Sequence, residues 1–498
     1  MISIRTFLII AAYLSAAICL VLVAVKIYIS TSYIPDISGS ETSSIFPIQR
    51  LSSGQSVYTD PEKPTFVMTQ YTPLYFAIAS FFVQLLDLEG LDVHKIFVVS
   101  RFLSIGFTIL ACVVIWFTLY KRTGKNILLA SLGTCFIYQV LAFWFLTSSR
   151  PDSLLVLCFS IFLYSVLNAL DRNDDSSIWW TVAAFMAITA FFVKQSGAIH
   201  SISLGLFLLS QRRWKLLLRT VVTAILFFLL YLIILPTSSL DIFFTNIVGG
   251  VANSTSWHWF YDWTLEKLLF QFAPLMALNF AIVGISLQRR DNLHYQFLSI
   301  CSIMLFAFSA TTAFKIGAGV GYFQTYLIVS VIFLIIFLRE KQHEFKLKNI
   351  LNISVASIYL TLVAVHCVLY VSKSYTEHSL ETFTNKYIEQ RDVAQFLKND
   401  KMLQKDEYVY ICSPDDFNGY YLNHFLYQNT LVPFSDIVYL ADKNDTFNFS
   451  ELNEMVAENR VKYVVADKDT EPKTILGQRF PNLNKIYSTE RLDVYQGY

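Results

Sequence analysis

The sequence predicts a polytopic α-helical membrane protein with about eleven transmembrane helices, followed by a C-terminal soluble α/β domain. Three observations predict this class. Hydrophobic residues make up 55% of the 498 residues and charged residues only 15%, whereas a soluble domain carries about 25% charged residues. The apolar residues form long runs separated by short basic loops, and beyond Lys373 the chain becomes rich in charge.

The charge balance and the cysteines argue against two other classes. The net charge is +1, so the chain lacks the basic excess of a nucleic-acid-binding protein, and no nucleic-acid partner is expected. The seven cysteines include no Cys-x-x-Cys pair. Neither a disulfide framework nor a zinc site is therefore predicted.

The apolar runs predict the spans in chain order. They cover residues 6–29, 96–120, 126–146, 152–170, 177–193, 196–210, 216–235, 267–287, 295–314, 322–338 and 350–371. The first run is too long for a signal-peptide core and lacks a cleavage site, so we expect a retained helix. The fifth and sixth runs are close to or below the roughly 17 residues that a span needs. A further run, 73–86, has only about fourteen apolar residues and predicts an interfacial or re-entrant helix.

The placement of lysine and arginine predicts the orientation. With a cytoplasmic N-terminus, four of the five inward loops are basic: 121–125, 211–219, 288–292 and 339–348. This is the pattern that the positive-inside rule requires, and only the loop at 171–175 (DRNDD) departs from it. Counting 73–86 as a span would reverse every later loop. The protein is therefore expected to be a multi-pass inner-membrane protein whose C-terminal domain is extracytoplasmic.

Two domains are predicted. Residues 1–371 form the membrane domain, in which residues 30–95 are a long outer loop with juxtamembrane helices. Residues 372–498 contain strand-like runs at 407–413 and 461–468, which alternate with helical periodicity at 390–400 and 449–460. This alternation is typical of a small α/β domain.

Polar and ionisable side chains collect in four loops that share the outer face. A charge at mid-bilayer costs on the order of 3 kcal/mol, so ionisable groups in or at the rim of a membrane are functional candidates. The loops are PDISGSE with Asp36 and Glu41, SSRPDS with Arg150 and Asp152, FFVKQSG with Lys194 and Gln195, and FKIGAGVGYFQTY with Lys315 and Tyr322. Their common side predicts one site assembled from several loops.

Three of these loops also have a plain structural interpretation. Asp36 and Glu41 can solvate the end of a helix. Arg150 and Asp152 can form a local ion pair at a helix start, and Lys194 can extend its charge toward the lipid headgroups.

Two further features stay open between structure and function. The glycines of residues 317–321 suit either close helix packing or an anion-binding turn. His258 lies in the aromatic loop NSTSWHWFYDW, which offers rings for stacking on a sugar but equally suits an aromatic belt at the membrane interface.

The order and sidedness of these motifs resemble the GT-C superfamily of membrane glycosyltransferases, especially lipid-A aminoarabinose transferases and protein O-mannosyltransferases. The matching motifs are the acidic motif of the first outer loop, YxPLYF at 71–76, RPDS at 150–153, KQ at 194–195 and KxGxxxxYF at 315–323. The resemblance covers roughly residues 1–340. One departure concerns the acidic motif, because many relatives carry adjacent Asp-Glu, whereas here Ser40 precedes Glu41 and Asp36 lies upstream.

The resemblance implies an inverting enzyme that moves one sugar from a polyprenyl-phosphate donor to a cell-surface glycan, glycolipid or protein on the extracytoplasmic face. Such a reaction needs a carboxylate base. Asp36 fits by its position just after the first helix and Glu41 by its spacing to LSSGQSVY; we favour Asp36. Cations stabilise the departing phosphate. The residues expected to bind the donor phosphate are Lys194, Lys315, Arg150 and Tyr322, and those expected to bind sugar or acceptor are Asp152, Tyr71, Gln195, His258 and Trp259. No cofactor is expected beside the lipid-linked sugar, no ligand cluster predicts a metal, and metal dependence stays open.

Two other classes remain as alternatives. A transporter or flippase of lipid-linked sugars would share the membrane location, although the spans show no paired broken helices of the inverted-repeat kind. A non-catalytic assembly protein with the same fold would explain the loss of the adjacent Asp-Glu pair.

Overall fold

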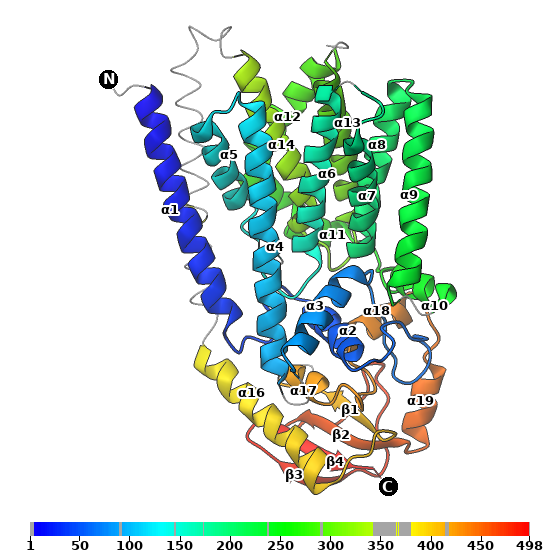
Figure 1. Cartoon of the computed structure of the whole chain (residues 1–498). Helices are drawn as coiled ribbons and strands as arrows, with labels where there is room; N and C mark the ends of the chain where they lie inside the picture. The colour runs from blue at the N-terminus through cyan, green and yellow to red at the C-terminus, as the bar shows by residue number, and fades with distance from the viewer. Residues whose placement is uncertain are drawn as a thin grey trace.

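The computed structural model of the chain describes residues 4–88, 92–143, 146–172, 174–236, 239–288, 292–341, 365, 367, 380–413 and 418–497. Figure 1 shows two parts, a bundle of long helices and a small sheet domain at one end of it. Short helices and loops lie between them, and this junction is where the polar loops of the bundle gather.

The bundle helices coincide with the first ten predicted spans. They are α1 (Ile4–Ser30), α4 (Val93–Arg122), α5 (Ile127–Val140), α6 (Asp152–Arg172), α7 (Ile178–Val193), α8 (Ala198–Ser210), α9 (Trp214–Ile234), α12 (Glu266–Leu287), α13 (Leu293–Thr312) and α14 (Gln324–Lys341). In the described part of the chain, seven helices are long and apolar enough to cross a membrane. The most apolar stretch of α9 has none of its residues buried in the protein, as expected of a helix that faces lipid.

Helix α5 is shorter than its predicted span, 126–146, whereas the shortness of α7 and α8 was expected from their runs. Helices α5, α7 and α8 have 14, 16 and 13 residues, whereas a full crossing takes about 20. The predicted span at 350–371 lies outside the described residues, apart from Val365 and Cys367. The total number of crossings therefore stays a prediction.

The short helices α2 (Thr42–Ser52), α3 (Leu74–Leu85), α10 (Leu240–Phe244) and α11 (Trp257–Phe260) connect the bundle helices. Helix α3 is the predicted interfacial run. Its 12 residues rise only about 18 Å, which is too short for a hydrocarbon core of about 30 Å. Figure 1 places α2 and α3 between the bundle and the sheet domain.

The acidic loop that departs from the positive-inside pattern is neutralised by its basic neighbours. Asp171 pairs with Arg122 at 2.7 Å and with Lys121 at 2.9 Å. Asp175 pairs with Arg213 at 3.2 Å. The acidic side chains thus offset part of the positive charge at the bundle end opposite the sheet domain.

The C-terminal sheet domain has four strands, β1 (Tyr408–Cys412), β2 (Val461–Asp467), β3 (Asn484–Ser488) and β4 (Leu492–Gln496), in the order β1-β2-β4-β3. Strand β1 runs parallel to β2, with Tyr410 opposite Val464, and the other pairs are antiparallel. The helices are α16 (Leu380–Gln395), α17 (Tyr420–Phe425), α18 (Ser435–Lys443) and α19 (Ser450–Ala457). Both predicted strands and both predicted helical segments are present. The predicted boundary at 371/372 lies outside the described residues.

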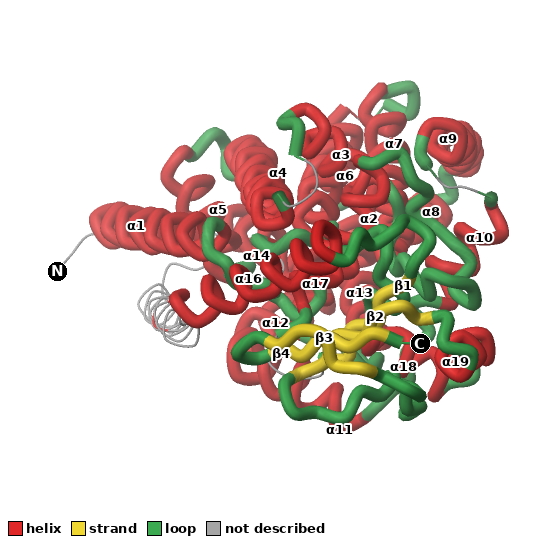
Figure 2. Tube along the Cα trace, turned by 90° about the horizontal axis from the view of Figure 1, so that it is seen from below, coloured by secondary structure: helices red, strands yellow, loops and turns green. Residues whose placement is uncertain are grey.

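Helix α17 docks the sheet domain on the bundle. The ring of Tyr421 packs edge-on against Phe97 of α4 at 5.3 Å between centroids. His424 Nδ1 lies 2.9 Å from Gln49 Oε1, and Gln49 donates back to the His424 carbonyl at 3.1 Å. All of these side chains are buried. Figure 2, seen from below, shows the sheet crossing the end of the bundle.

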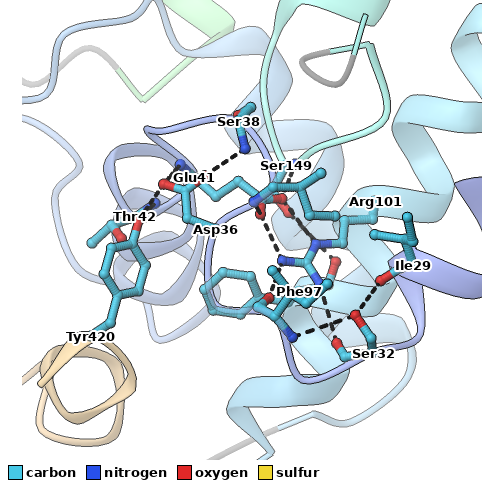
Figure 3. A network of polar contacts seen from close by, with 12 residues as sticks. Ile29, Ser32, Asp36, Ser38, Glu41, Thr42, Phe97, Arg101, Ser149 and Tyr420 are labelled. Carbon is cyan, nitrogen blue, oxygen red and sulfur yellow. Dashed lines mark hydrogen bonds and ion pairs between the residues drawn. The ribbon is translucent and has the colours of Figure 1, made fainter. Parts of the chain in front are cut away.

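A buried ion pair holds the first outer loop against the bundle. The guanidinium of Arg101 on α4 donates two hydrogen bonds to the Glu41 carboxylate, from Nε to Oε1 at 3.0 Å and from Nη2 to Oε2 at 2.6 Å. Neither side chain is exposed. Arg101 also donates from Nη2 to the Ile34 carbonyl at 2.6 Å and from Nη1 to the Ser32 carbonyl at 3.4 Å, so the arginine fastens the loop at three points (Figure 3).

We expect Glu41→Gln to destabilise the protein strongly, because it leaves the Arg101 charge buried without a counter-charge. Breaking one partner of a buried pair costs about 3–5 kcal/mol. The double variant Glu41→Gln with Arg101→Met removes both charges and should recover part of this loss. Thermal unfolding of the purified protein in lipid nanodiscs measures both effects.

A matched control is Lys63→Gln, which breaks the exposed pair of Lys63 with Glu451 between the first outer loop and the sheet domain, 2.9 Å long. An exposed ion pair contributes little to stability, so the unfolding temperature should hardly change. Equal losses for Glu41→Gln and Lys63→Gln would contradict the anchoring role of Arg101.

Candidate functional site

A cavity of about 730 Å³ lies between the bundle end and the sheet domain. The bundle side contributes residues from three of the four predicted loops and from neighbouring segments: Asp36, Gln70, Tyr71, Arg150, Asn253, Trp259, Lys315 and Tyr322. The loop with Lys194 and Gln195 does not line it. The sheet domain contributes residues of β1, α17 and α18 and the segments beside them, among them Ile411, Tyr420, Asn423, Phe434 and Asp436. One cavity therefore unites segments that are far apart in the sequence, from Asp36 to Ile475.

Asp36 lines this cavity with its carboxylate held by four hydrogen bonds. Oδ1 accepts from the backbone N–H groups of Ser38 at 2.8 Å and Gly39 at 2.7 Å. Oδ2 accepts from the N–H of Glu41 at 3.0 Å and from the hydroxyl of Tyr420. Gly39 adopts a φ of +83°, a left-handed conformation that suits glycine and lets the loop curl around the carboxylate.

The pKa of Asp36 is raised above its usual value. Burial is the main cause, and the negative charge of Glu41 adds to it, while the hydrogen bonds from Tyr420, Ser38 and Glu41 act in the opposite direction. Burial also raises the pKa of Tyr420 well above its usual value, so the phenol stays protonated and donates. A raised carboxylate pKa brings a base closer to the pH at which it works.

Glu41 has a different environment. Besides the two bonds from Arg101, its Oε1 accepts from the Ser149 N–H at 2.6 Å and its Oε2 from the Ile37 N–H at 2.8 Å. The side chain is fully buried and does not line the cavity. Of the two candidate bases, Asp36 faces the open space and Glu41 joins three segments of chain (Figure 3).

Arg150, Asp152 and Lys194 form a line of alternating charge at the membrane side of the cavity. Asp152 Oδ2 lies 3.3 Å from Arg150 Nε, and Oδ1 lies 2.8 Å from Lys194 Nζ. Burial opposes the charge of Arg150, but Tyr71, Asp152 and Asp36 outweigh it and raise its pKa. The pKa of Lys194 is raised in the same way, since Asp152 outweighs the effect of burial.

Two aromatic rings separate Lys194 from the large cavity. Its ammonium lies 5.3 Å from the ring centre of Tyr71 and 5.0 Å from that of Tyr322, and both rings line the cavity. Lys194 itself lines a much smaller adjoining cavity of about 20 Å³, together with Asp152 and Tyr322. The turn that follows Lys194 requires glycine at position 197, because a Cβ there would lie only 2.2 Å from the backbone of Ala190.

Lys315 lines the cavity from a loop that is hydrogen-bonded to the loop at residues 253–254. The N–H of Ile316 donates to the Ser254 carbonyl at 2.9 Å, and Asn253 Nδ2 donates to the Ile316 carbonyl at 2.9 Å. Within the described ranges, no carboxylate forms an ion pair with Lys315. Burial, followed by the nearby charge of Lys194, lowers the pKa of Lys315 to about 8.

The remaining candidates fall into two groups. Trp259 lines the cavity, and its indole N–H donates to the Ala318 carbonyl at 2.6 Å. His258 is exposed, pairs with Asp262 at 3.2 Å and does not line the cavity. Gln195 also lies away from it and donates to the backbone carbonyls of Gln70 and Ile247.

Two residues at the site were not among the predicted ones. Arg101 carried a signal, since it is a charge inside the apolar run 96–120, and such charges are functional or structural candidates. Tyr420 carried none, because nothing in the sequence indicates which side chain of a soluble domain reaches the membrane domain. Among the described residues, no group of three or more His, Cys, Asp or Glu could hold a metal ion.

Comparison with known proteins gives one family match and several fold matches. The family model of dolichyl-phosphate-mannose-protein mannosyltransferases matches residues 70–239. A search of curated protein sequences finds no match. The structure resembles ArnT from Cupriavidus metallidurans bound to undecaprenyl phosphate, with a TM-score of 0.57, 13% identity and 97% of each chain covered.

Two further structures share the fold. The apo state of the same ArnT gives a TM-score of 0.61 at 14% identity, covering 96% of this chain and 97% of that one. AglB from Archaeoglobus fulgidus, an archaeal oligosaccharyltransferase in complex with an inhibitory peptide and a dolichol-phosphate, gives 0.54 at 12% identity, covering 91% of this chain and 69% of that one. These matches confirm the resemblance that the motifs indicated, and the chain has the fold of the GT-C membrane glycosyltransferases.

Proposed function

We propose that the protein is an inverting glycosyltransferase that moves one sugar from a polyprenyl-phosphate donor to a hydroxyl of a glycan, glycolipid or protein. The observation that carries this proposal is the composition of one cavity. It contains a buried, hydrogen-bonded carboxylate, Asp36, together with two cations, Arg150 and Lys315. A base for the acceptor and positive charge for a leaving phosphate are the two requirements of this reaction.

In this mechanism the acceptor oxygen attacks C1 of the sugar and forms a new C–O bond. The bond between C1 and the phosphate oxygen breaks, and its electron pair stays on the polyprenyl phosphate. The proton of the acceptor hydroxyl moves to Asp36 Oδ2. Arg150 and Lys315 stabilise the negative charge that develops on the phosphate, and Asp152 keeps Arg150 in place. No further cofactor is proposed, since the donor brings its own leaving group.

The structural relatives support the choice of donor. ArnT was solved with undecaprenyl phosphate and AglB with a dolichol-phosphate, so two proteins of this fold bind a polyprenyl-phosphate carrier. The sugar and the acceptor of the present chain are not specified by these likenesses. Tyr71 and Trp259 line the cavity and offer rings on which a sugar can stack.

We also propose that the cavity faces the extracytoplasmic side. Figure 1 places the C-terminal end of α4 and the α8–α9 turn, which carry basic loops, at the bundle end away from the sheet domain. Basic loops remain cytoplasmic during insertion. A transporter of lipid-linked sugars is less well supported, because the charges that line the cavity lie at one end of the bundle and not along a path through it.

Replacing Asp36 by Asn should strongly reduce transfer while carrier binding persists. An amide cannot take the acceptor proton, and loss of a general base reduces turnover by about 10²–10⁴-fold. The measurement is release of free polyprenyl phosphate from a panel of polyprenyl-phosphate sugars, with purified protein in lipid and candidate acceptors present.

The matched control for this experiment is Asp436→Asn. Asp436 is an exposed carboxylate that lines the same cavity from α18, and its loss should leave the chemical step intact. If wild-type protein binds the carrier but releases it from no donor, the proposal of a transferase is wrong and a transporter or an assembly protein is favoured.

Carrier binding should weaken at alkaline pH through Lys315. Its pKa of about 8 means that the ammonium is charged below this pH and loses its proton above it. Phosphate binding favours the charged form, so affinity is complete below pH 8 and falls above it, by up to about tenfold per pH unit.

This dependence is measured as the dissociation constant of polyprenyl phosphate between pH 7.5 and about 9.5, where the phosphate itself no longer changes charge. Lys315→Arg keeps a permanent charge and should bind with nearly constant affinity across this range. An equally steep loss in both proteins would show that another group titrates.

A further inference from the structure

The fourth hydrogen bond of Asp36 comes from the other domain. Three of its donors, the N–H groups of Ser38, Gly39 and Glu41, belong to the loop that Asp36 itself begins. The fourth is the hydroxyl of Tyr420, the first residue of α17, 384 positions along the chain. This hydroxyl also accepts a long bond of 3.4 Å from the Thr42 N–H. Figure 3 shows the Tyr420 side chain reaching from α17 to the carboxylate.

These four bonds leave Asp36 no lone pair for a substrate. A carboxylate offers about four acceptor positions, and each oxygen of Asp36 already has two donors. A base must come within about 2.6–3.2 Å of the proton that it removes. An acceptor hydroxyl can therefore bind productively only if one present donor leaves.

Three of the donors are held in place by the rest of the structure. The N–H groups of Ser38, Gly39 and Glu41 are fixed by the loop, and the loop is fastened by the pair of Glu41 with Arg101 at 2.6 Å. Tyr420 is different, because it reaches Asp36 with a side chain that partly faces the cavity. A rotation of the Tyr420 side chain withdraws this hydroxyl and leaves the three N–H donors of the loop in place.

We infer that the Tyr420 hydroxyl occupies the position of the acceptor hydroxyl on Asp36 Oδ2 and yields it when an acceptor enters the cavity. The inference rests on the proposed function and makes Tyr420 a positioning residue contributed by the sheet domain. Before the acceptor binds, Tyr420 also keeps water from Asp36. This matters because water in that position would attack C1, break its bond to the phosphate oxygen, pass a proton to Asp36 and release free sugar and polyprenyl phosphate.

Tyr420→Phe tests this role by opening the position without removing the ring. Acceptor-independent hydrolysis of the donor should rise on the order of tenfold, the effect of one hydrogen bond to a charged group, and transfer to acceptor should change less. The matched control is Tyr427→Phe, which removes another phenol bond between the sheet domain and the first outer loop, to Ser53 at 2.6 Å, without touching Asp36. A fall of hydrolysis and transfer together in Tyr420→Phe would overturn the inference, because it would indicate a merely structural tyrosine.

A second measurement needs no turnover. Asp36 is influenced by Glu41 of its own loop, Arg101 of α4, Arg150 of the loop before α6 and Tyr420 of α17. Of these, only the Tyr420 bond is lost in Tyr420→Phe, and this bond lowers the pKa of Asp36. The carboxyl band of Asp36 in infrared titration, identified by its loss in Asp36→Asn, should shift its midpoint to higher pH in Tyr420→Phe and stay in place in Tyr427→Phe.

The two measurements separate this inference from the proposed function. An unchanged midpoint in Tyr420→Phe would show that Tyr420 does not donate a hydrogen bond to Asp36, whether or not a donor reacts. If the midpoint shifts but the ratio of hydrolysis to transfer does not rise, Tyr420 does not reserve the acceptor position. Absence of turnover in wild-type protein refutes the transferase and, with it, the acceptor role of this position, while the infrared titration still decides whether the bond exists.

Discussion

The arrangement of the site depends on the buried pair of Glu41 with Arg101. This pair joins the first outer loop to α4, and through the Ser149 N–H it also joins the loop that precedes α6. Two charges taken out of water are not a cheap source of stability, since desolvation offsets much of their attraction. Here the ion pair serves to position the first outer loop. The loop from Asp36 to Glu41 is fixed at its far end, so its backbone N–H groups point at the Asp36 carboxylate.

The cations around the cavity are not equivalent, and their differences follow from their partners. Asp152 lies between Arg150 and Lys194 and neutralises part of their charge. Lys315 has no such carboxylate among the described residues, and burial lowers its pKa to about 8. An incoming phosphate would restore the missing counter-charge for Lys315, whereas it would have to compete with Asp152 for Lys194. In the proposed reaction Lys315 would gain most from a bound phosphate, and Asp152 would orient Arg150.

Much of the fold could be predicted from the sequence, because a long apolar run predicts a membrane helix and a basic loop predicts its cytoplasmic end without any knowledge of tertiary contacts. The first ten spans coincide with helices, and the strands at 408–412 and 461–467 were expected. The four polar loops were expected to form one site; residues of three of them line one cavity, whereas Lys194 and Gln195 of the fourth do not. The β3–β4 hairpin was missed, since β3 is short and largely exposed and so has no clear apolar alternation. The role of Tyr420 could not be predicted for another reason. It depends on how α17 docks on α4 through Tyr421 and Phe97, and this tertiary contact has no sequence signal.

The division of the cavity between two domains suggests how donor and acceptor can be recognised separately. Its charged wall, with Arg150 and Lys315, belongs to the bundle, where the proposed lipid carrier would arrive from the membrane. Its other wall belongs to the sheet domain and is mostly apolar, with Ile411 and Phe434 beside the carboxylate of Asp436. A change of acceptor would then require changes in the sheet domain only, and the donor chemistry could stay as it is. Asp36 lies where the two walls meet, and because one of its four hydrogen bonds comes from the sheet domain, the state of the sheet-domain wall would act directly on the proposed base.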